Sequence, residues 1–181
     1  ALRRLDVLDR SIVDLDPIAR LVGLQHLSVQ AAEHAVLDIA ALSKLRSVSG
    51  EWALIGSTLS DATELESVIT WAFGDDDLRA FRDHVALTAL TIKDAPYLES
   101  LSGLGGLPDR GVLAVVAAPR LDEIGDVAEL SASLRELKFE KCVRINAIGD
   151  IEPLVSLRFL SVSDCADIAS LLPGRALVAL E

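Results

Sequence analysis

The chain has 181 residues, 51% of them hydrophobic and only 4% aromatic, which is enough for one domain with an aliphatic core. Its 17 basic residues are scattered among 28 acidic ones, and the net charge of −11 argues against nucleic-acid binding. No stretch of about 18 uninterrupted apolar residues occurs, so we expect a soluble chain without a transmembrane helix.

A nine-residue pattern begins with LRRLDVLDR at 2–10 and recurs to LRFLSVSDC at 157–165. Within each copy apolar and polar residues alternate, which predicts a half-buried β-strand. The copies at 45–53 and 65–73 are the poorest, and the copy at 110–118 lacks a leucine at its first position. The copies start every 20 to 24 residues, at 2, 24, 45, 65, 87, 110, 134 and 157. Eight units, here called rungs 1 to 8, therefore account for nearly the whole chain.

The middle of the chain departs most from this pattern. Rung 3 has Gly50 where most other rungs carry Val, Ile or Phe. In rung 4 the acidic run 75–77 precedes LRAFRDHVA, and carboxylates favour the start of a helix. We therefore expect a short amphipathic helix that buries Leu78, Phe81 and Val85. A metal site is the minor alternative, because the GDDD run lacks the residue spacing of a calcium loop.

The later connecting segments are expected to be short and irregular. The stretch GLGG at 103–106 precedes Pro108 and is predicted to be a loop and not a phosphate-binding turn. Rung 7 has Ile or Leu at every third residue from Ile145 to Leu157, which suits a tight 3-10-like or irregular turn. Residues 177–181 restart the pattern as a ninth strand, with a short helix within 172–181 as the alternative.

The recurring unit resembles the leucine-rich repeat, whose motif is LxxLxLxxN/C followed by a variable half. Cys142 and Cys165, the only cysteines, occupy its last position. The variable halves at 11–24 and 143–157 resemble those of the internalins and of the phosphatase-regulatory-subunit type of repeat. The resemblance implies an α/β solenoid of about eight rungs, with a parallel sheet on the concave face and irregular, 3-10 or short helical segments on the convex face. The cysteines are then stacked core thiols, although a disulfide or an oxidation sensor stays open.

Nothing in the sequence indicates an enzyme or a cofactor. His26, His34 and His84 share no ligand spacing, and the motifs of zinc proteases, serine hydrolases and P-loop enzymes are absent. Two cysteines and three histidines are also too few for a predicted metal centre. We therefore expect a non-catalytic protein.

The scaffold instead predicts recognition of a protein or peptide on the concave face. Both tryptophans are expected there, on adjacent rungs, and large exposed aromatic side chains are typical binding anchors. The alternative is that their rings fold into the core to fill the space left at Gly50. The predicted partner-binding residues are Trp52, Ile69, Trp71, Lys93, Val116, Lys138 and Glu140.

The wider context is also predicted. Residues 1–181 are expected to form a single leucine-rich repeat domain, without a recognisable cap and hence part of a longer chain, as a monomer or within a multidomain protein. Two cysteines favour a reducing, cytoplasmic compartment, with secretion or surface exposure left open. An excess of Arg over Lys and high Ala, Val and Asp favour a bacterial source. Two alternative functions stay open, a regulatory or sensor domain for an attached catalytic or NTPase domain and an accessory scaffold of an enzyme complex.

Overall fold

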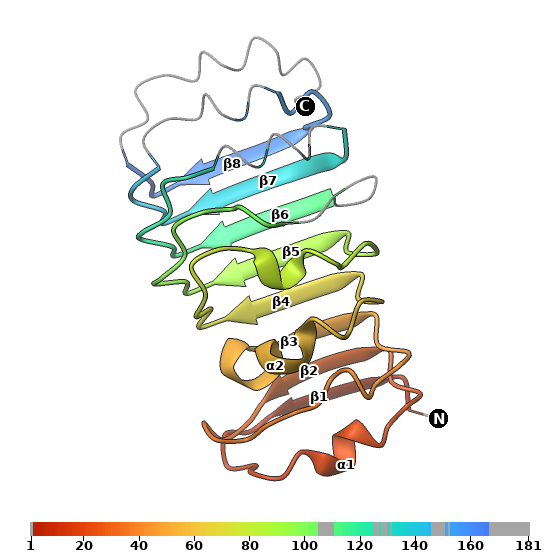
Figure 1. Cartoon of the computed structure of the whole chain (residues 1–181). Coiled ribbons are helices and arrows are strands. Elements are labelled where there is room, and N and C mark those ends of the chain that lie inside the picture. The colour runs from red at the N-terminus through yellow and green to blue at the C-terminus, as the bar shows by residue number, and fades with distance from the viewer. Residues whose placement is uncertain are drawn as a thin grey trace.

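The computed structural model describes residues 2–104, 111–124, 127, 130, 132–145, 151 and 153–166. Eight strands form one all-parallel sheet in which each strand lies beside its neighbours in the sequence (Figure 1). Each strand covers at least the third to seventh residues of one predicted copy, which confirms the eight-rung parallel solenoid. The strands are β1 (Arg4–Leu8), β2 (His26–Gln30), β3 (Ser47–Glu51), β4 (Ser67–Trp71), β5 (Ala89–Lys93), β6 (Gly111–Val116), β7 (Leu134–Glu140) and β8 (Phe159–Ser163).

Equivalent positions of the motif pair across every neighbouring pair of strands. Even the two poorest copies are aligned, with Val48 of β3 opposite Val68 of β4. The one irregularity among these pairs is a register shift at Gly111 and Val112, where β6 meets the longer β7. The repeat therefore sets the register, and each motif position forms a row of side chains that runs across the sheet.

The core is built from the fourth and sixth positions of the motif. Leu137 and Phe139 are fully buried, as the alternation of apolar and polar residues predicts, and the side chain of Lys138 between them is not. Leu160 and Val162 of β8 also pack against the core but stay partly exposed. Alternate residues therefore face opposite sides of the sheet, as the sequence pattern predicted.

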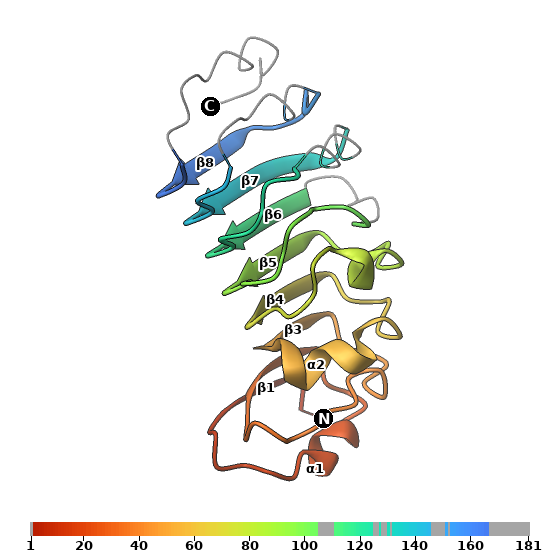
Figure 2. The same cartoon turned by 60° about the vertical axis from the view of Figure 1, so that its left-hand side comes forward.

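The connecting segments return along one side of the sheet, which is the side that carries the helices (Figure 2). They include α1 (Asp16–Ala19), α2 (Trp52–Leu59) and the 3-10 turn η1 (Arg79–Phe81). Helix α2 explains the glycine of rung 3. A Cβ atom at Gly50 would lie 3.1 Å from Ile55 Cγ2, so Ile55 occupies the space that a larger residue fills in other rungs.

Where the sequence predicts an amphipathic helix in rung 4, the structure has only a 3-10 turn. The prediction of burial is also wrong for one of the three residues. Leu78 and Phe81 are buried, but Val85 is 78% exposed. His84 is buried in its place, with 3% exposure. A 3-10 turn has three residues per turn, so the inward face repeats at 78, 81 and 84 and not at the 3.6-residue period of an α-helix. As expected for the acidic run, the carboxylate of Asp77 accepts the backbone N–H of Arg79 at 2.9 Å.

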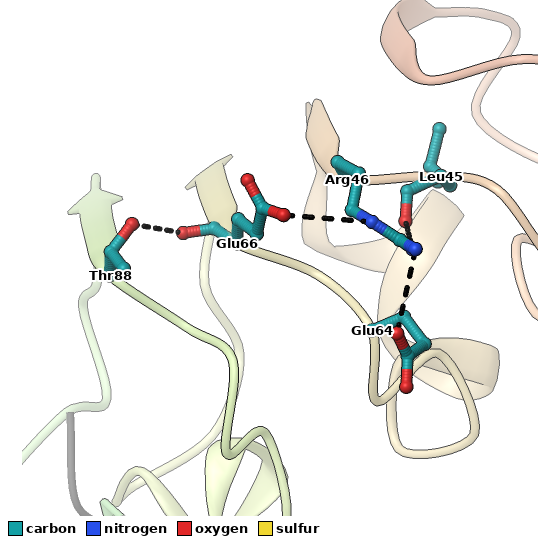
Figure 3. Close-up of polar contacts among 5 residues, drawn as sticks. All are labelled: Leu45, Arg46, Glu64, Glu66 and Thr88. Atoms are coloured by element: carbon teal, nitrogen blue, oxygen red, sulfur yellow. Dashed lines mark hydrogen bonds and ion pairs between the residues drawn. The ribbon is translucent and has the colours of Figure 1, made fainter. Parts of the chain in front are cut away.

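The edge where the chain enters the strands is held by a chain of polar contacts (Figure 3). Arg46 lies 3.5 Å from Glu64 and 3.6 Å from Glu66, and its guanidinium also donates to the carbonyl of Leu45 at 3.2 Å. The hydroxyl of Thr88 then donates to the carbonyl of Glu66 at 2.9 Å. Arg46, Glu66 and Thr88 hold the same motif position on rungs 3 to 5, so we interpret these contacts as links between rungs.

Several predictions fall on residues 105–110 and 167–181, which lie outside the described part of the chain. They are the second half of GLGG, the ninth strand and the terminal helix. Gly103, which is described, has φ +81° and packs against Arg79, so an added Cβ atom would collide with Cγ of that residue. This close approach explains why position 103 is a glycine. Within the described residues, no helix is long and apolar enough to cross a membrane.

Candidate functional site

The face of the sheet opposite the helices, which we call the concave face, carries four of the predicted binding residues side by side. Trp71 of β4 pairs with Lys93 of β5, Lys93 with Val116 of β6, and Val116 with Glu140 of β7. All four hold the seventh position of the motif, so one row presents an indole, an ammonium, an isopropyl group and a carboxylate. We call this row the seventh-position row.

The fifth-position row beside it contains the two other predicted residues of this face. Ile69 is 36% exposed and lies between Ser49 and Thr91, so it is a lone branched aliphatic side chain among hydroxyl groups. Lys138 lies on the same strand as Glu140, and its ammonium is 2.9 Å from that carboxylate. The bond from Lys138 holds the pKa of Glu140 below its usual range, and the nearby charges of Lys141 and Lys93 act in the same direction. Lys138 therefore contacts Glu140 directly, and Lys93 and Lys141 act on its charge.

The prediction for Trp52 requires a correction. Rung 3 turns into α2 at this residue, so its ring swings away from the row that contains Trp71. The ring centroid lies 4.5 Å from that of Phe73 and 6.0 Å from that of Phe81, and the indole N–H donates to Asp75 at 3.2 Å. Trp52 is thus a partly buried structural side chain at the margin of the core. It does not fill the space at Gly50, as the alternative from the sequence had it, because Ile55 occupies that space.

The carboxyl ends of β4 to β8 share an uncommon backbone conformation. The eighth motif residue of every rung from 4 to 8 has a positive φ, between 50° and 58°, although none of them is glycine. This turn redirects the chain so that the ninth residue, such as Phe73 or Cys142, enters the core. Non-glycine residues pay about 1–2 kcal/mol for this conformation, so it persists because the stacked rungs impose it. These eighth residues are Ala72, Asp94, Ala117, Lys141 and Asp164.

A groove of about 610 Å³ runs along this edge of the sheet, across the ends of β4 to β7. Two alanines form part of its lining, and only Asp94 and Lys141 contribute charged side chains. The groove adjoins the seventh-position row, because each eighth residue directly follows a member of that row. Its lining residues are Ala72, Phe73, Gly74, Asp94, Pro96, Tyr97, Ala117, Pro119 and Lys141.

The aromatic wall of the groove is Tyr97, which is 54% exposed. The guanidinium of Arg120 lies over its ring at 5.7 Å from the centroid and also pairs with Glu99 at 3.6 Å. Arg120 therefore covers part of a ring that the fold leaves in solvent. Sequence reasoning missed this groove, although Pro96 and Pro119 at the same place in two successive rungs were a detectable signal.

The two cysteines differ in their surroundings. Both are free thiols, as predicted, but only Cys142 is fully buried, and Cys165 is partly exposed. Burial raises the pKa of the Cys142 thiol to about 11. Its sulfur lies 3.5 Å from the carbonyl oxygen of Glu140 and 3.7 Å from that of Val115. A thiol in this environment is held as a neutral core group.

The described residues offer no metal centre, since no three His, Cys, Asp or Glu side chains among them could hold an ion together. The acidic run 75–77 is used for structure. Asp75 accepts the indole N–H of Trp52, and Asp77 binds the backbone and side chain of Arg79.

Comparison with known proteins identifies the fold. No family model and no curated protein sequence matches the chain. An internalin (inlF) from Listeria monocytogenes has a similar structure, with a TM-score of 0.52 and 18% identity over 99% of this chain and 57% of that one. Internalin C2 (inlC2) from the same organism also matches, with a TM-score of 0.52 and 17% identity over 98% of this chain and 68% of that one. The chain therefore has a leucine-rich repeat fold like that of the internalins, and it spans little more than half the length of the first of them.

Proposed function

We propose that this leucine-rich repeat chain is a non-catalytic recognition module that binds a protein partner on its concave face. The observation that carries the proposal is the seventh-position row, where Trp71, Lys93, Val116 and Glu140 lie on four successive strands. Ile69 lies on the same strand as Trp71, two residues away, and presents a branched apolar group to solvent.

The chemistry of this surface resembles that of protein interfaces. Their centres are enriched in aromatic residues and surrounded by polar groups, and a few anchors supply most of the binding energy. A partly buried indole, with Ile69 on one side and hydroxyl groups and charges around it, is such an arrangement. The internalin-like fold supports the same general role, because stacked rungs produce an extended concave binding surface.

The proposal is tested by site-specific photo-cross-linking in extracts of the cells that make the protein. A photoreactive amino acid replaces Thr91, which lies between Ile69 and Ala114 on the concave face, or Val85, which is exposed in a connecting segment. We expect one protein to be cross-linked from position 91 and not from position 85, and Trp71→Ala to abolish the adduct. Equal adducts from both positions, an adduct indifferent to Trp71→Ala, or no adduct from position 91 would contradict the proposal.

A further inference from the structure

The groove at the carboxyl ends of β4 to β7 has the size and lining of a binding site for a side chain. Its volume of about 610 Å³ falls within the range of roughly 300–1,000 Å³ that is typical of ligand pockets. Phe73, Tyr97, Pro96 and Pro119 give it an apolar lining on three successive rungs. Small eighth residues leave the groove open, because the side chains of Ala72 and Ala117 end at Cβ. An aromatic or branched aliphatic group suits this shape.

The charges beside the groove indicate what accompanies that group. The chain has only four lysines, and three of them lie on or directly after β5 and β7, namely Lys93, Lys138 and Lys141. Lys138 is compensated by its ion pair with Glu140. Lys93 and Lys141 form no ion pair with any residue that the structure describes. Two ammonium groups without an ion pair among the described residues therefore lie at this margin of a protein whose net charge is −11.

These two ammonium groups flank one apolar strand end. Lys93 lies on β5 and Lys141 directly follows β7, so β6 runs between them and ends at Val116, directly before Ala117. Two strand spacings separate their backbones by roughly 10 Å, which lets both long side chains reach one anion held above β6. Asp94 directly follows Lys93 and lines the groove two rungs from Lys141, so its charge shifts an anion bound between the two lysines toward Lys141.

We propose that this groove binds an aromatic or branched aliphatic side chain from an acidic segment of the partner protein, with a carboxylate of that segment held over β6 between Lys93 and Lys141. The inference rests on the proposed function, because it assumes that the partner is a protein. It adds a second contact surface that continues from the concave face around the edge of the sheet. An acidic segment is repelled by most of this anionic molecule, so the lysines also restrict where it binds.

Three blocked pentapeptides serve as probes. The first has a central tryptophan flanked by glutamates, the second has the same tryptophan flanked by lysines, and the third has a central alanine flanked by glutamates. Binding is followed at millimolar concentrations through amide chemical shifts of the isotope-labelled protein. We expect only the first peptide to bind appreciably, to shift the amides of Phe73, Tyr97 and Ala117, and to bind more weakly as salt is added.

Two variants with matched controls locate the contacts. Lys141→Glu should weaken binding of the first peptide by about tenfold or more, whereas Lys44→Glu, which alters the fourth lysine away from the groove, should leave it unchanged. Tyr97→Ala should weaken binding similarly, whereas Phe159→Ala, an equally exposed aromatic residue on β8, should not. The far-UV spectra and melting temperatures of the variants establish that each is folded.

Several results would overturn the inference. They are stronger binding of the lysine peptide, shifts confined to the middle of the sheet, equal effects of Lys141→Glu and Lys44→Glu, and no binding of any peptide. Groove shifts that depend on protein concentration alone would identify a second copy of the chain as the occupant. Each of these leaves the cross-linking experiment at Thr91 unaffected, so failure of the groove and failure of the concave face are distinguishable.

Discussion

The two tryptophans lie on adjacent rungs, but the structure predicts opposite responses to their removal. The ring of Trp52 contacts Phe73 and Phe81, and its N–H binds Asp75. Aromatic pairs contribute about 0.5–1.5 kcal/mol each beyond area burial, and a hydrogen bond contributes about 1 kcal/mol. Because Trp52 is partly exposed, we expect Trp52→Ala to lower the free energy of unfolding by about 2–4 kcal/mol. Trp71→Ala, on the concave face, should lower it by less than about 1 kcal/mol.

The assay is urea denaturation followed by circular dichroism, with the two alanine variants compared under identical conditions. Fluorescence of single-tryptophan proteins provides an independent readout. In the Trp71→Phe variant, the remaining Trp52 should emit at shorter wavelength and resist quenching by iodide more than Trp71 does in the Trp52→Phe variant. Equal losses of stability, or a larger loss for Trp71→Ala, would refute the packing that we describe around Trp52.

Three other residues give predictions of stability and reactivity. Thr70 is fully buried and its hydroxyl has no partner among the described residues. Thr70→Val should therefore raise the free energy of unfolding, measured by urea denaturation, by about 1–2 kcal/mol. A lower free energy of unfolding would show that the hydroxyl is hydrogen-bonded. Burial lowers the pKa of His84 below its unfolded value of about 6.5. The contribution of neutral His84 to the free energy of unfolding should therefore be complete above about pH 6.5 and be lost as the pH falls toward the folded pKa. His84→Leu should therefore flatten the acid side of the pH–stability curve, and an unchanged slope would assign it to other groups. Because burial raises its pKa to about 11, the thiol of Cys142 should react with a maleimide only after unfolding. Mass spectrometry should therefore find Cys165 labelled before Cys142. Rapid labelling of Cys142 in the folded protein would contradict its burial.

The repeat made most of the fold predictable from the sequence. Motif positions alternate between the core and the concave face, so Leu137 and Lys138 could be assigned to opposite faces without coordinates. Stacking then fixed which residues of neighbouring rungs lie side by side, even where the motif is poor. The seventh-position row from Trp71 to Glu140 follows from this register alone.

The error at Trp52 arose because rung 3 does not follow the backbone path of rungs 4 to 8. In rungs 4 to 8 the eighth residue adopts a left-handed turn, whereas in rung 3 that residue is Trp52 and begins α2. The segment WALIGSTL contains Gly56, a serine and a threonine, so its helix propensity is weak and does not indicate a helix. The tertiary packing of Ile55 against Gly50 favours the helix there. His84 and not Val85 is buried because the segment forms a 3-10 turn, whose period differs from that of the predicted α-helix.

The groove could not be deduced from strand periodicity, because it depends on how the turns after four strands align. Apart from Phe73 at the ninth position, its lining comes from the eighth, tenth and eleventh positions of the rungs, where the motif places no constraint. Equivalent prolines at Pro96 and Pro119 were visible in the sequence, but the exposed ring of Tyr97 beneath Arg120 required coordinates.

The central claim is that the concave face recognises a protein. It is tested most directly by the affinity of the Trp71→Ala variant for the partner that cross-linking identifies. An anchor at the centre of an interface contributes about 2 kcal/mol or more, so the dissociation constant should rise roughly 30-fold. Val85→Ala, which removes an exposed side chain from a connecting segment, should leave the dissociation constant unchanged. An unchanged affinity for Trp71→Ala, measured by titration calorimetry with a folded variant, would contradict the account.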